Sequence, residues 1–479
     1  MASSSAPDQP QVIPSEMENF VVGLIGMGDM GKMYAQRLSA AGWKNSQCFA
    51  RNHLLYTSWK DGPQRRMADD GNFGRIMACD QEEKYESLQE EFSGNNNIQI
   101  CRNGHYVSRA SDYIIYSVEA AAIDRVIAQY GPSTKLGAIV GGQTSCKDPE
   151  ITAFERHLPS DVDIVSCHSL HGPNVDPRNQ PLVIIAHRAS PVSVRKVETV
   201  LSVLGSKHVY LSAHEHDRIT ADTQAVTHAA FLSMGKAWHA NTQFPWEMAR
   251  YVGGVENVKI NIMLRIYSQK WHVYAGLAIL NPEARKQISQ FARSVTDLYK
   301  LMLEGDGPAL RARVLAAKER VFGGQQEHKW ADKPLLNPDL LERFSLGKKE
   351  DQTEPPRANN HLSLLAMVDC WAQLGIVPYD HMICSTPLFR LWLGVAEHLF
   401  RSPEMLDDAL RTAVEDHTYR SDDLEFTFAA RGWAECVSLG HFETWKNRFE
   451  TTQEFFQPRF KDAVAVGNAM MKAVLESTK

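Results

Sequence analysis

The chain has 479 residues, a net charge of −6 and a hydrophobic content of 43%, ordinary values for a globular protein of two or three domains. The weakly acidic balance excludes a global basic field that would attract nucleic acid. No apolar run approaches the ~20 residues of a membrane span. Residues 1–17 are predicted to be a disordered lead-in without a targeting signal. The eight scattered cysteines include no CxxC pair, which predicts reduced thiols and a cytoplasmic location.

The first predicted element is a dinucleotide-binding loop. From Phe20 the chain reads FVVGLIGMGDMGKMYAQRLSAAGW, in which a β-branched run ends in a GxGxxG motif and leads into a helical pattern. The three glycines allow a tight turn, close approach of a pyrophosphate and tight helix packing, with the phosphates at the helix N-terminus. The alternative is a purely structural glycine turn. The predicted loop residues are Gly26, Met27, Gly28, Asp29, Met30 and Gly31.

The same fingerprint predicts an acidic residue after the second strand, roughly 20 residues farther along. Asp80, in RIMACDQEEKYESL, is the best candidate, although it lies about 30 residues too far along. The surplus, at residues 44–75, shows no clear helix or strand period and is interpreted as an insertion. Two alternatives are a gene-model artefact and a loop whose arginines bind a 2′-phosphate.

Strands and helices alternate through the remainder of this region. Strand-like runs at residues 111–118, 137–141, 163–167 and from Pro181 are separated by loops and helical segments. The alternation predicts a Rossmann-type, doubly wound and mostly parallel sheet over residues 18–212. Ligands of such sheets bind beyond the C-terminal ends of the strands. The loops at Ser117, Ser145 and His168 are predicted to lie there.

The remainder of the chain is predicted to be helical. Two stretches that begin at His228 and His361 carry His, Leu, Met, Trp and Pro at the same offsets. This favours an internal duplication over a chance similarity of amphipathic helices. The predicted copies are residues 213–323 and 359–479, joined by a polar linker at 324–358. We expect an intramolecular pseudo-dimer of the two copies, or a homodimer.

Several motifs together resemble the fungal prephenate dehydrogenases of tyrosine biosynthesis. They are GLIGMGDMG, SDYIIYSVEA, GGQTSCK, CHSLHGP, HEHDRITADTQAVTHAAFLSMG and RIYSQKWHVYAGLA, and the similarity covers residues 18–479 apart from 44–75. The resemblance implies oxidative decarboxylation of prephenate to 4-hydroxyphenylpyruvate, with hydride transfer to NADP. Asp80 would instead favour NAD, by bonding the ribose 2′-hydroxyl and repelling a 2′-phosphate, so NAD stays possible.

Residues 166–173, SCHSLHGP, hold two histidines. The resemblance places the catalytic base at His168, which must accept a hydroxyl proton and so needs a pKa near the working pH. The alternative for His168 is a loop-capping role. His171 is expected to belong to the turn that Gly172 and Pro173 complete. No metal site is expected, because no further Cys or His ligands stand at matching spacing.

The resemblance also implies residues that contact the substrate. Ser145 would bond the substrate hydroxyl or orient His168, with a helix N-cap as the alternative. His228 would face the substrate unless it is a buried helix-start histidine, and Gln224, one helical turn earlier, shares that face. The two substrate carboxylates need cations. The family's arginine has no clean match in this chain, so the candidates are Arg265, Lys270 and Arg390, each of which could instead be solvated or ion-paired.

Two other functions are compatible with a Rossmann domain followed by helices. A β-hydroxyacid dehydrogenase would usually rely on a catalytic lysine of the helical domain. A non-enzymatic dinucleotide sensor would bind the cofactor without oxidising prephenate. The presence of His168 and Ser145 favours oxidation of prephenate over both alternatives.

Overall fold

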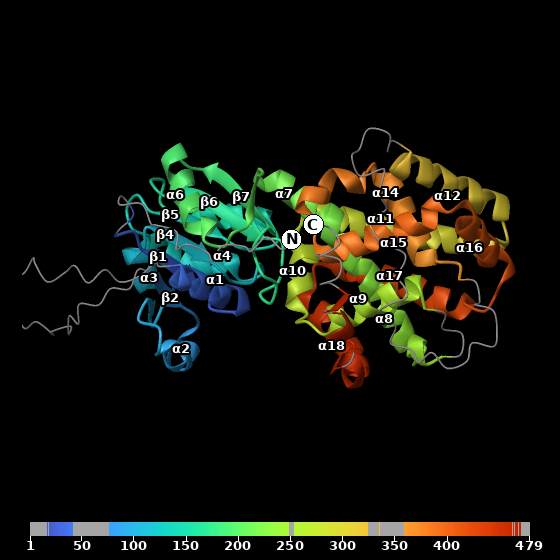
Figure 1. The fold of residues 1–479 in the computed structure, drawn as a ribbon, viewed down its shortest axis with the longest axis horizontal. Helices are drawn as coiled ribbons and strands as arrows, with labels where there is room; N and C mark the ends of the chain where they lie inside the picture. The colour runs from blue at the N-terminus through green and yellow to red at the C-terminus, as the bar shows by residue number, and fades with distance from the viewer. Residues whose placement is uncertain are drawn as a thin grey trace, which may run out of the picture. The chain divides into compact units, whose positions relative to one another are not determined.

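Figure 1 shows the chain in a computed structural model. The structure describes residues 17, 19–41, 76–248, 253–323, 335, 359–461, 463, 465–467 and 469–470. The predicted lead-in, insertion and linker therefore lie outside the described residues, except for Met17 and Leu335. The chain divides into two compact units. We call them the sheet unit (Met1–Thr144 and Pro149–Ala213) and the helical unit (Ser145–Asp148 and His214–Lys479).

The described residues of the sheet unit form an eight-stranded sheet of order β3-β2-β1-β4-β5-β6-β7-β8. All neighbouring strands are parallel except β6 and β7, which are antiparallel. This confirms the predicted mostly parallel Rossmann-type sheet. The strands are β1 (Val22–Ile25), β2 (Ile76–Cys79), β3 (Ile98–Ile100), β4 (Tyr113–Tyr116), β5 (Ile139–Gly142), β6 (Asp163–Ser169), β7 (Pro181–Arg188) and β8 (Lys207–Tyr210).

Helices cover both faces of this sheet (Figure 1). The core of one face contains residues of α1 (Asp29–Ala40), α2 (Tyr85–Phe92) and α6 (Pro191–Ser202). The core of the other face contains residues of α3 (Gly104–Ala110), α4 (Ile123–Tyr130) and α5 (Lys147–His157). The central strands are buried on both sides, which explains why β1, β4 and β5 read as apolar runs rather than alternating patterns.

The helical unit forms around one hydrophobic core that draws on both predicted copies. In Figure 1, helices from the yellow-green and gold part of the chain lie among the orange and red ones. Its elements are α7 (Ala213–Thr220), the π-helix η4 (Ala221–Ala225), α8 (Val226–Ala240), α9 (Val255–Tyr267), α10 (His272–Leu280), α11 (Pro282–Glu304), α12 (Gly307–Phe322), α14 (Leu362–Leu374), the 3₁₀ helix η7 (Pro378–Cys384), α15 (Pro387–Arg401), α16 (Pro403–Glu415), α17 (Arg420–Leu439) and α18 (Phe442–Phe456). Shorter 3₁₀ turns lie at Glu82–Lys84, Gly131–Ser133, Pro245–Glu247 and Gln457–Arg459.

The long central helix α11 has clear start and stop signals. Oδ1 of Asn281 accepts hydrogen bonds from the N–H groups of Glu283 and Ala284, and Pro282 occupies the first helical position. Gly305 ends the helix in a left-handed conformation, with a φ of +70°. The helix therefore begins and ends where its own sequence dictates. No helix among the described residues is long and apolar enough to cross a membrane.

Contacts across the two halves are specific. The rings of Phe231 and Trp392 lie 4.7 Å apart between centroids, in an edge-to-face arrangement. Arg313 of α12 donates from Nε and Nη2 to the two oxygens of Asp369 on α14, both at 2.8 Å. Such a bidentate pair is geometrically demanding, and Asp369 is fully buried. The helices of the two halves thus pack as one body within a single chain.

Candidate functional site

The glycine loop of the sheet unit lies between β1 and α1, beside the end of β4. Gly26 has a φ of +101°, a conformation that L side chains rarely adopt. A Cβ atom on Gly26 would clash with the carbonyl oxygen of Ser117, and one on Gly31 would clash with the carbonyl oxygen of Gly26. The packing of the protein itself therefore requires both of these glycines and places Ser117 beside the loop.

The middle glycine, Gly28, is not required by any described neighbour. It is exposed, and a Cβ atom there would meet no heavy atom within 4 Å. Gly28 is also the N-cap of α1, where the helix has N–H groups without intrahelical partners. A bare backbone at a helix N-terminus fits the pyrophosphate of a dinucleotide. Of the neighbouring loop residues, Met27 is buried, Met30 half-buried and Asp29 exposed.

The sheet topology places this loop at the expected position. In the observed order, β1 is flanked by β2 on one side and β4 on the other, so the chain changes direction across the sheet at that point. Doubly wound sheets bind ligands at this switch point, outside the C-terminal ends of the strands. Gly26 follows β1 and Ser117 follows β4, so both lie at that edge.

Asp80 follows β2 and turns its carboxylate toward the glycine loop. Its Oδ2 accepts a hydrogen bond from the N–H of Met27 at 2.8 Å. Its Oδ1 accepts from the N–H of Gln81 at 2.7 Å and from Nζ of Lys84 at 3.0 Å. The side chain is only 9% exposed. The ammonium group of Lys84 offsets the charge of Asp80, which weakens the expected repulsion of a 2′-phosphate.

His168 lies near the C-terminal end of β6 and is 8% exposed. Ser166, two residues earlier and thus on the same side of the strand, donates to Oε1 of Glu150. Oε2 of Glu150 accepts from the N–H and the hydroxyl of Thr144, at 3.0 and 2.6 Å. This buried network ties the loop after β5 to the strand that carries His168.

Gln143 is a candidate that the sequence reasoning missed. It follows β5 as Ser117 follows β4, and Tyr116 and Gly142 are cross-strand neighbours, so both residues lie at the same edge of the sheet. Nε2 and Oε1 of Gln143 are buried and have no hydrogen-bond partner among the described residues. Burying an amide in this way is unfavourable unless something else supplies the partners. Its position directly after a buried strand is the sequence signal that could have identified it.

His171 lies beyond the end of β6. Its Nδ1 donates to the carbonyl oxygen of Gly172 at 2.9 Å, and burial lowers the pKa of its imidazole. This hydrogen bond is local to the turn before Pro173. Among the residues that the structure describes, no group of three or more His, Cys, Asp or Glu side chains could hold a metal ion.

Ser145 opens the short segment that belongs to the helical unit. The carboxylate of Asp217 accepts hydrogen bonds from the N–H groups of Lys147 and Asp148, at 2.7 and 2.8 Å. His216 lies 2.8 Å from the same carboxylate. Asp217 therefore serves the first N–H groups of α5, which is the task of a helix cap. The alternative interpretation of Ser145 as that cap loses its support.

Gln224 and His228 lie one helical turn apart, in η4 and the first turn of α8, and so share a face. Nε2 of Gln224 and Nδ1 of His228 are buried and have no hydrogen-bond partner among the described residues. Burial lowers the pKa of His228 to about 4, so its imidazole is neutral at pH 7. Buried polar groups without partners beside a π-helix are typical of a ligand-binding surface.

Arg265 is the cation that the structure brings near His228. The rings of His228 and Tyr274 lie 4.8 Å apart between centroids, edge to face. Burial raises the pKa of Tyr274, and the nearby charge of Arg265 opposes that rise. Burial also lowers the pKa of the Arg265 guanidinium. Tyr274 thus contacts the histidine on one side and senses the arginine on the other.

The other two cation candidates are less suited to this surface. Lys270 is exposed in the turn after α9. Arg390, in the first turn of α15, donates from Nε to Oγ of Ser385 at 2.8 Å and from Nη2 to the carbonyl oxygen of Met382 at 3.3 Å. Arg390 thereby holds the end of η7. Of the three cations, Arg265 is the best placed.

The second half of the helical unit supports the π-helix of the first. Nε2 of His381, in η7, lies 2.9 Å from Oδ2 of Asp222 in η4, and the two side chains are 13% and 7% exposed. The other oxygen of Asp222 accepts from Nε2 of Gln287 on α11. These contacts anchor the segment that carries Gln224. Sequence reasoning did not single them out, because no short motif joins positions so far apart in the chain.

The chain is similar to known proteins over almost its whole length. Residues 225–476 match a family model for the 6-phosphogluconate dehydrogenase C-terminal domain. A probable prephenate dehydrogenase (NADP(+)) of Schizosaccharomyces pombe is 52% identical over 96% of this chain and 99% of that protein. The prephenate dehydrogenase (NADP(+)) of Saccharomyces cerevisiae is 49% identical over 95% of this chain and 94% of that protein. A crystal structure of prephenate dehydrogenase from A. aeolicus, 16% identical, superimposes with a TM-score of 0.45 over 61% of this chain and 94% of the other.

Proposed function

Because the chain belongs to the family of NADP-dependent fungal prephenate dehydrogenases, we propose that it oxidatively decarboxylates prephenate to 4-hydroxyphenylpyruvate. The observation that carries this function is the 52% identity to a relative of that name over 96% of this chain and 99% of the relative. The reaction belongs to tyrosine biosynthesis. Neither a β-hydroxyacid dehydrogenase nor a dinucleotide sensor has comparable support.

The glycine loop supports NADP as the cofactor. The uncovered backbone of Gly28 at the N-terminus of α1 would take the pyrophosphate. Lys84, already held at Asp80, would supply positive charge for a 2′-phosphate. Gln143 would offer its amide to a ligand at the same edge of the sheet. When bound, NADP accepts the hydride.

His168 is the proposed general base. Loss of a hydride from the ring carbon that bears the hydroxyl requires that the hydroxyl proton be accepted, and a neutral imidazole can do this near neutral pH. The carbonyl that results is conjugated through the ring to the carbon bearing the carboxylate. CO₂ therefore leaves readily, and the ring becomes aromatic. Ser145 would hold the hydroxyl or orient the imidazole of His168.

The helical unit is proposed to bind prephenate through the surface of Gln224, His228 and Arg265. The Nε2 group of Gln224 can donate a hydrogen bond, and the neutral imidazole of His228 can donate or accept one. Arg265 would hold one carboxylate of the substrate. Support comes from the two buried polar atoms without described partners and from the position of Arg265 beside Tyr274.

The activity is tested with purified chain, prephenate and either NADP or NAD. We expect NADP reduction that depends on prephenate, with 4-hydroxyphenylpyruvate and CO₂ formed in equal amounts to the reduced cofactor. Matched reactions with 3-hydroxy acids serve as controls and should show no turnover. Oxidation of 3-hydroxy acids without oxidation of prephenate would contradict the proposed function, and a strong preference for NAD would contradict the proposed cofactor.

We further propose that the helical unit is an intramolecular pseudo-dimer and that the protein is cytoplasmic. The pseudo-dimer is supported by the shared core and by the Arg313–Asp369 pair across the halves. The location is supported by seven buried cysteines with free thiols. Analytical ultracentrifugation should find a monomer with full activity. Activity that appears only in a dimeric fraction would contradict the pseudo-dimer.

A further inference from the structure

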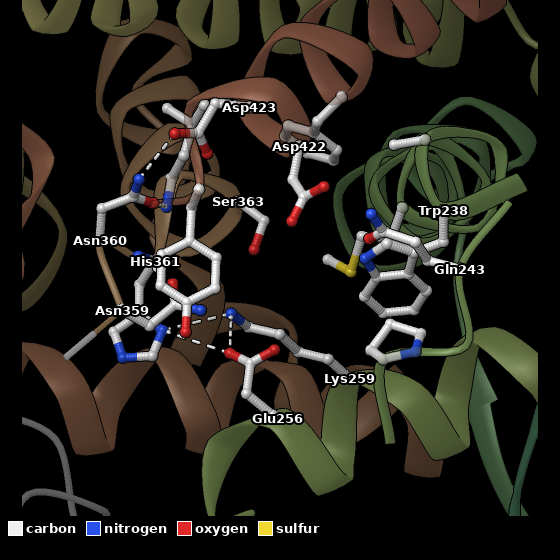
Figure 2. A pocket seen from close by; sticks show the side chains of 16 residues that line it. Trp238, Gln243, Glu256, Lys259, Asn359, Asn360, His361, Ser363, Asp422 and Asp423 are labelled. Carbon is white, nitrogen blue, oxygen red and sulfur yellow. Dashed lines mark hydrogen bonds and ion pairs between the residues drawn. The ribbon is translucent and has the colours of Figure 1, made fainter. Parts of the chain in front are cut away.

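A second pocket lies within the helical unit, lined by residues of both halves, and encloses about 110 Å³. It is distinct from the surface formed by Gln224, His228 and Arg265, since none of these residues lines it. Residues of α8, α9, the start of α14 and α17 surround it (Figure 2). A cavity of this volume accommodates a ligand of a few non-hydrogen atoms and, being polar on several sides, is suited to more than water.

One side of the pocket is a buried ion pair. Nζ of Lys259 donates to Oε1 of Glu256 at 2.8 Å and lies 3.2 Å from Nδ1 of His361. Burial would raise the pKa of Glu256, but the adjacent Lys259 and His361 outweigh it and hold the pKa at about 2. The charges of Glu256 and Lys259 therefore cancel within this cluster. His361 has a φ of +51°, an uncommon conformation for a non-glycine residue.

The opposite side of the pocket is acidic. Oδ2 of Asp423 accepts a hydrogen bond from Nδ2 of Asn360 at 2.7 Å, and Oδ1 of Asp422 accepts from Nδ2 of Asn241 at 2.6 Å. Asp423 is only 7% exposed and forms no ion pair with any residue that the structure describes. Burial raises its pKa to about 7. A buried carboxylate with a single amide donor is unfavourable unless a cation approaches it.

The remaining wall is apolar and aromatic. Trp238 and Met234 of α8 and Phe426 of α17 line it. In Figure 2, Asp422 and Ser363 point into the same space, Lys259 enters from the opposite side, and the indole of Trp238 lies along a third side. Aromatic faces next to carboxylates favour organic cations, because the ring face is electronegative and the ring is also apolar.

We propose that this pocket binds a small organic ammonium ligand, with its ammonium group at Asp422 and Asp423 and its carbon chain against Trp238 and Met234. Such a ligand would supply the buried carboxylate of Asp423 with the missing cation and would place its apolar part on the apolar wall. The ligand is a simple amine or the ammonium group of an amino acid, and the two share the same chemistry at Asp423. The site does not depend on the proposed dehydrogenase activity.

The test uses three probes that share a three-carbon chain: n-propylammonium, butanoate and L-2-aminobutanoate. Each is titrated calorimetrically into the full chain, with potassium chloride as a control for an inorganic cation. Propylammonium or aminobutanoate should bind, and butanoate and potassium should not. Tighter binding of aminobutanoate would identify an amino acid, whose carboxylate gains from Lys259 and Ser363. Tighter binding of propylammonium would identify a simple amine.

The matched variants are Asp423→Asn and, on the surface, Asp407→Asn, whose carboxylate pairs with Arg311 and is 53% exposed. Asp423→Asn should weaken binding of the ammonium probes by at least about tenfold, and Asp407→Asn should leave it unchanged. Asp422→Asn is the second pocket variant, should the first fail to fold. Binding of butanoate or potassium as tight as that of propylammonium would overturn the proposal. So would the absence of binding by both ammonium probes, or unchanged binding in the pocket variants.

Discussion

Nε2 of Gln224 and Nδ1 of His228 lie on one face of a continuous helix, both buried and both without a hydrogen-bond partner among the described residues. A protein normally satisfies such groups, because leaving one buried and unbonded costs about 1–3 kcal/mol. The pair is therefore understandable if prephenate supplies the missing partners. Stability and substrate binding should then respond to substitution in opposite ways.

Replacing Gln224 with leucine is expected to separate the two effects. Gln224→Leu removes an unsatisfied donor, so the free energy of unfolding without substrate should stay unchanged or rise by about 1 kcal/mol. The KM for prephenate should rise about tenfold, which corresponds to ~1.4 kcal/mol of binding. Gln287→Leu is the matched control, because it removes the hydrogen bond to Asp222 and should lower stability by about 1–3 kcal/mol. Thermal melts and steady-state kinetics measure both quantities.

His168→Asn should lower kcat/KM for prephenate by about 10²–10⁴-fold, the usual contribution of a general base. The loss should appear in kcat, while the dissociation constant for NADP stays near that of the unsubstituted protein. His171→Asn is the control, since that imidazole bonds the adjacent Gly172, and it should retain most activity. An unchanged kcat in His168→Asn would refute the assignment of the base.

Gly28→Ala and Gly26→Ala should fail for different reasons. Alanine at position 28 meets no described neighbour, so the protein should keep its melting temperature but lose affinity for NADP. Alanine at position 26 would adopt a positive φ and meet the carbonyl oxygen of Ser117, which should destabilise the fold by at least about 1–2 kcal/mol. Fluorescence titration with NADPH and thermal melts distinguish the two outcomes. Full NADPH affinity in Gly28→Ala would rule out the proposed cradle.

Lys84→Ala tests the cofactor preference. If the ammonium group of Lys84 offsets Asp80 and attracts a 2′-phosphate, its loss should raise the KM for NADP about tenfold and leave the KM for NAD nearly unchanged. Lys286→Ala is the control, because that lysine is exposed on α11 and pairs with Glu283. Equal effects of Lys84→Ala on both cofactors would show that the lysine does not read the 2′-phosphate.

The pH dependence of stability should contain two opposing contributions from the helical unit. The pKa of His228 is lowered from 6.5 to about 4, so the unfolded chain binds more protons between those values. Its contribution is present above pH 6.5 and is lost as the pH falls through 4, by up to about 3 kcal/mol. The pKa of Asp423 is raised from 3.8 to about 7, so its contribution is present below pH 3.8 and is lost as the pH rises through 7.

Variants separate these two contributions. Relative to the unsubstituted protein, His228→Gln should become more stable as the pH falls from 6.5 to 4, and Asp423→Asn should become more stable as the pH rises from 4 to 7. Denaturant unfolding at a series of pH values measures both slopes. Parallel slopes for the two variants would contradict the assigned direction of at least one pKa.

Much of the sheet unit follows from local sequence. The GLIGMGDMG motif predicts β1, the loop and α1, because the required conformation of Gly26 and the helix start are set by adjacent residues. The direction of β7 was not predicted, since an apolar run does not show which way its strand points. The link of residues 170–180 is too short for a crossover helix, and this was the available signal for an antiparallel partner.

The site was predictable only in part. Motif similarity identified His168 and Gln224, but Gln143 and His381 emerged from long-range packing. Gln143 is unusual because of contacts that it lacks, and no motif encodes a missing contact. His381 matters through Asp222, which lies in the other half of the helical unit. A choice among Arg265, Lys270 and Arg390 likewise required the position of Tyr274 and the hydrogen bonds of Arg390.

The packing of both halves in one chain has an evolutionary consequence. In a symmetric dimer encoded by one gene, every substitution occurs twice, so neither copy can specialise alone. Here His228 and His361 occupy matching places in the two similar stretches but have different surroundings. His228 packs against Tyr274, whereas His361 lies at Glu256 and Lys259. Covalent fusion frees each half to accumulate its own substitutions, so one can conserve a reaction while the other acquires a new ligand.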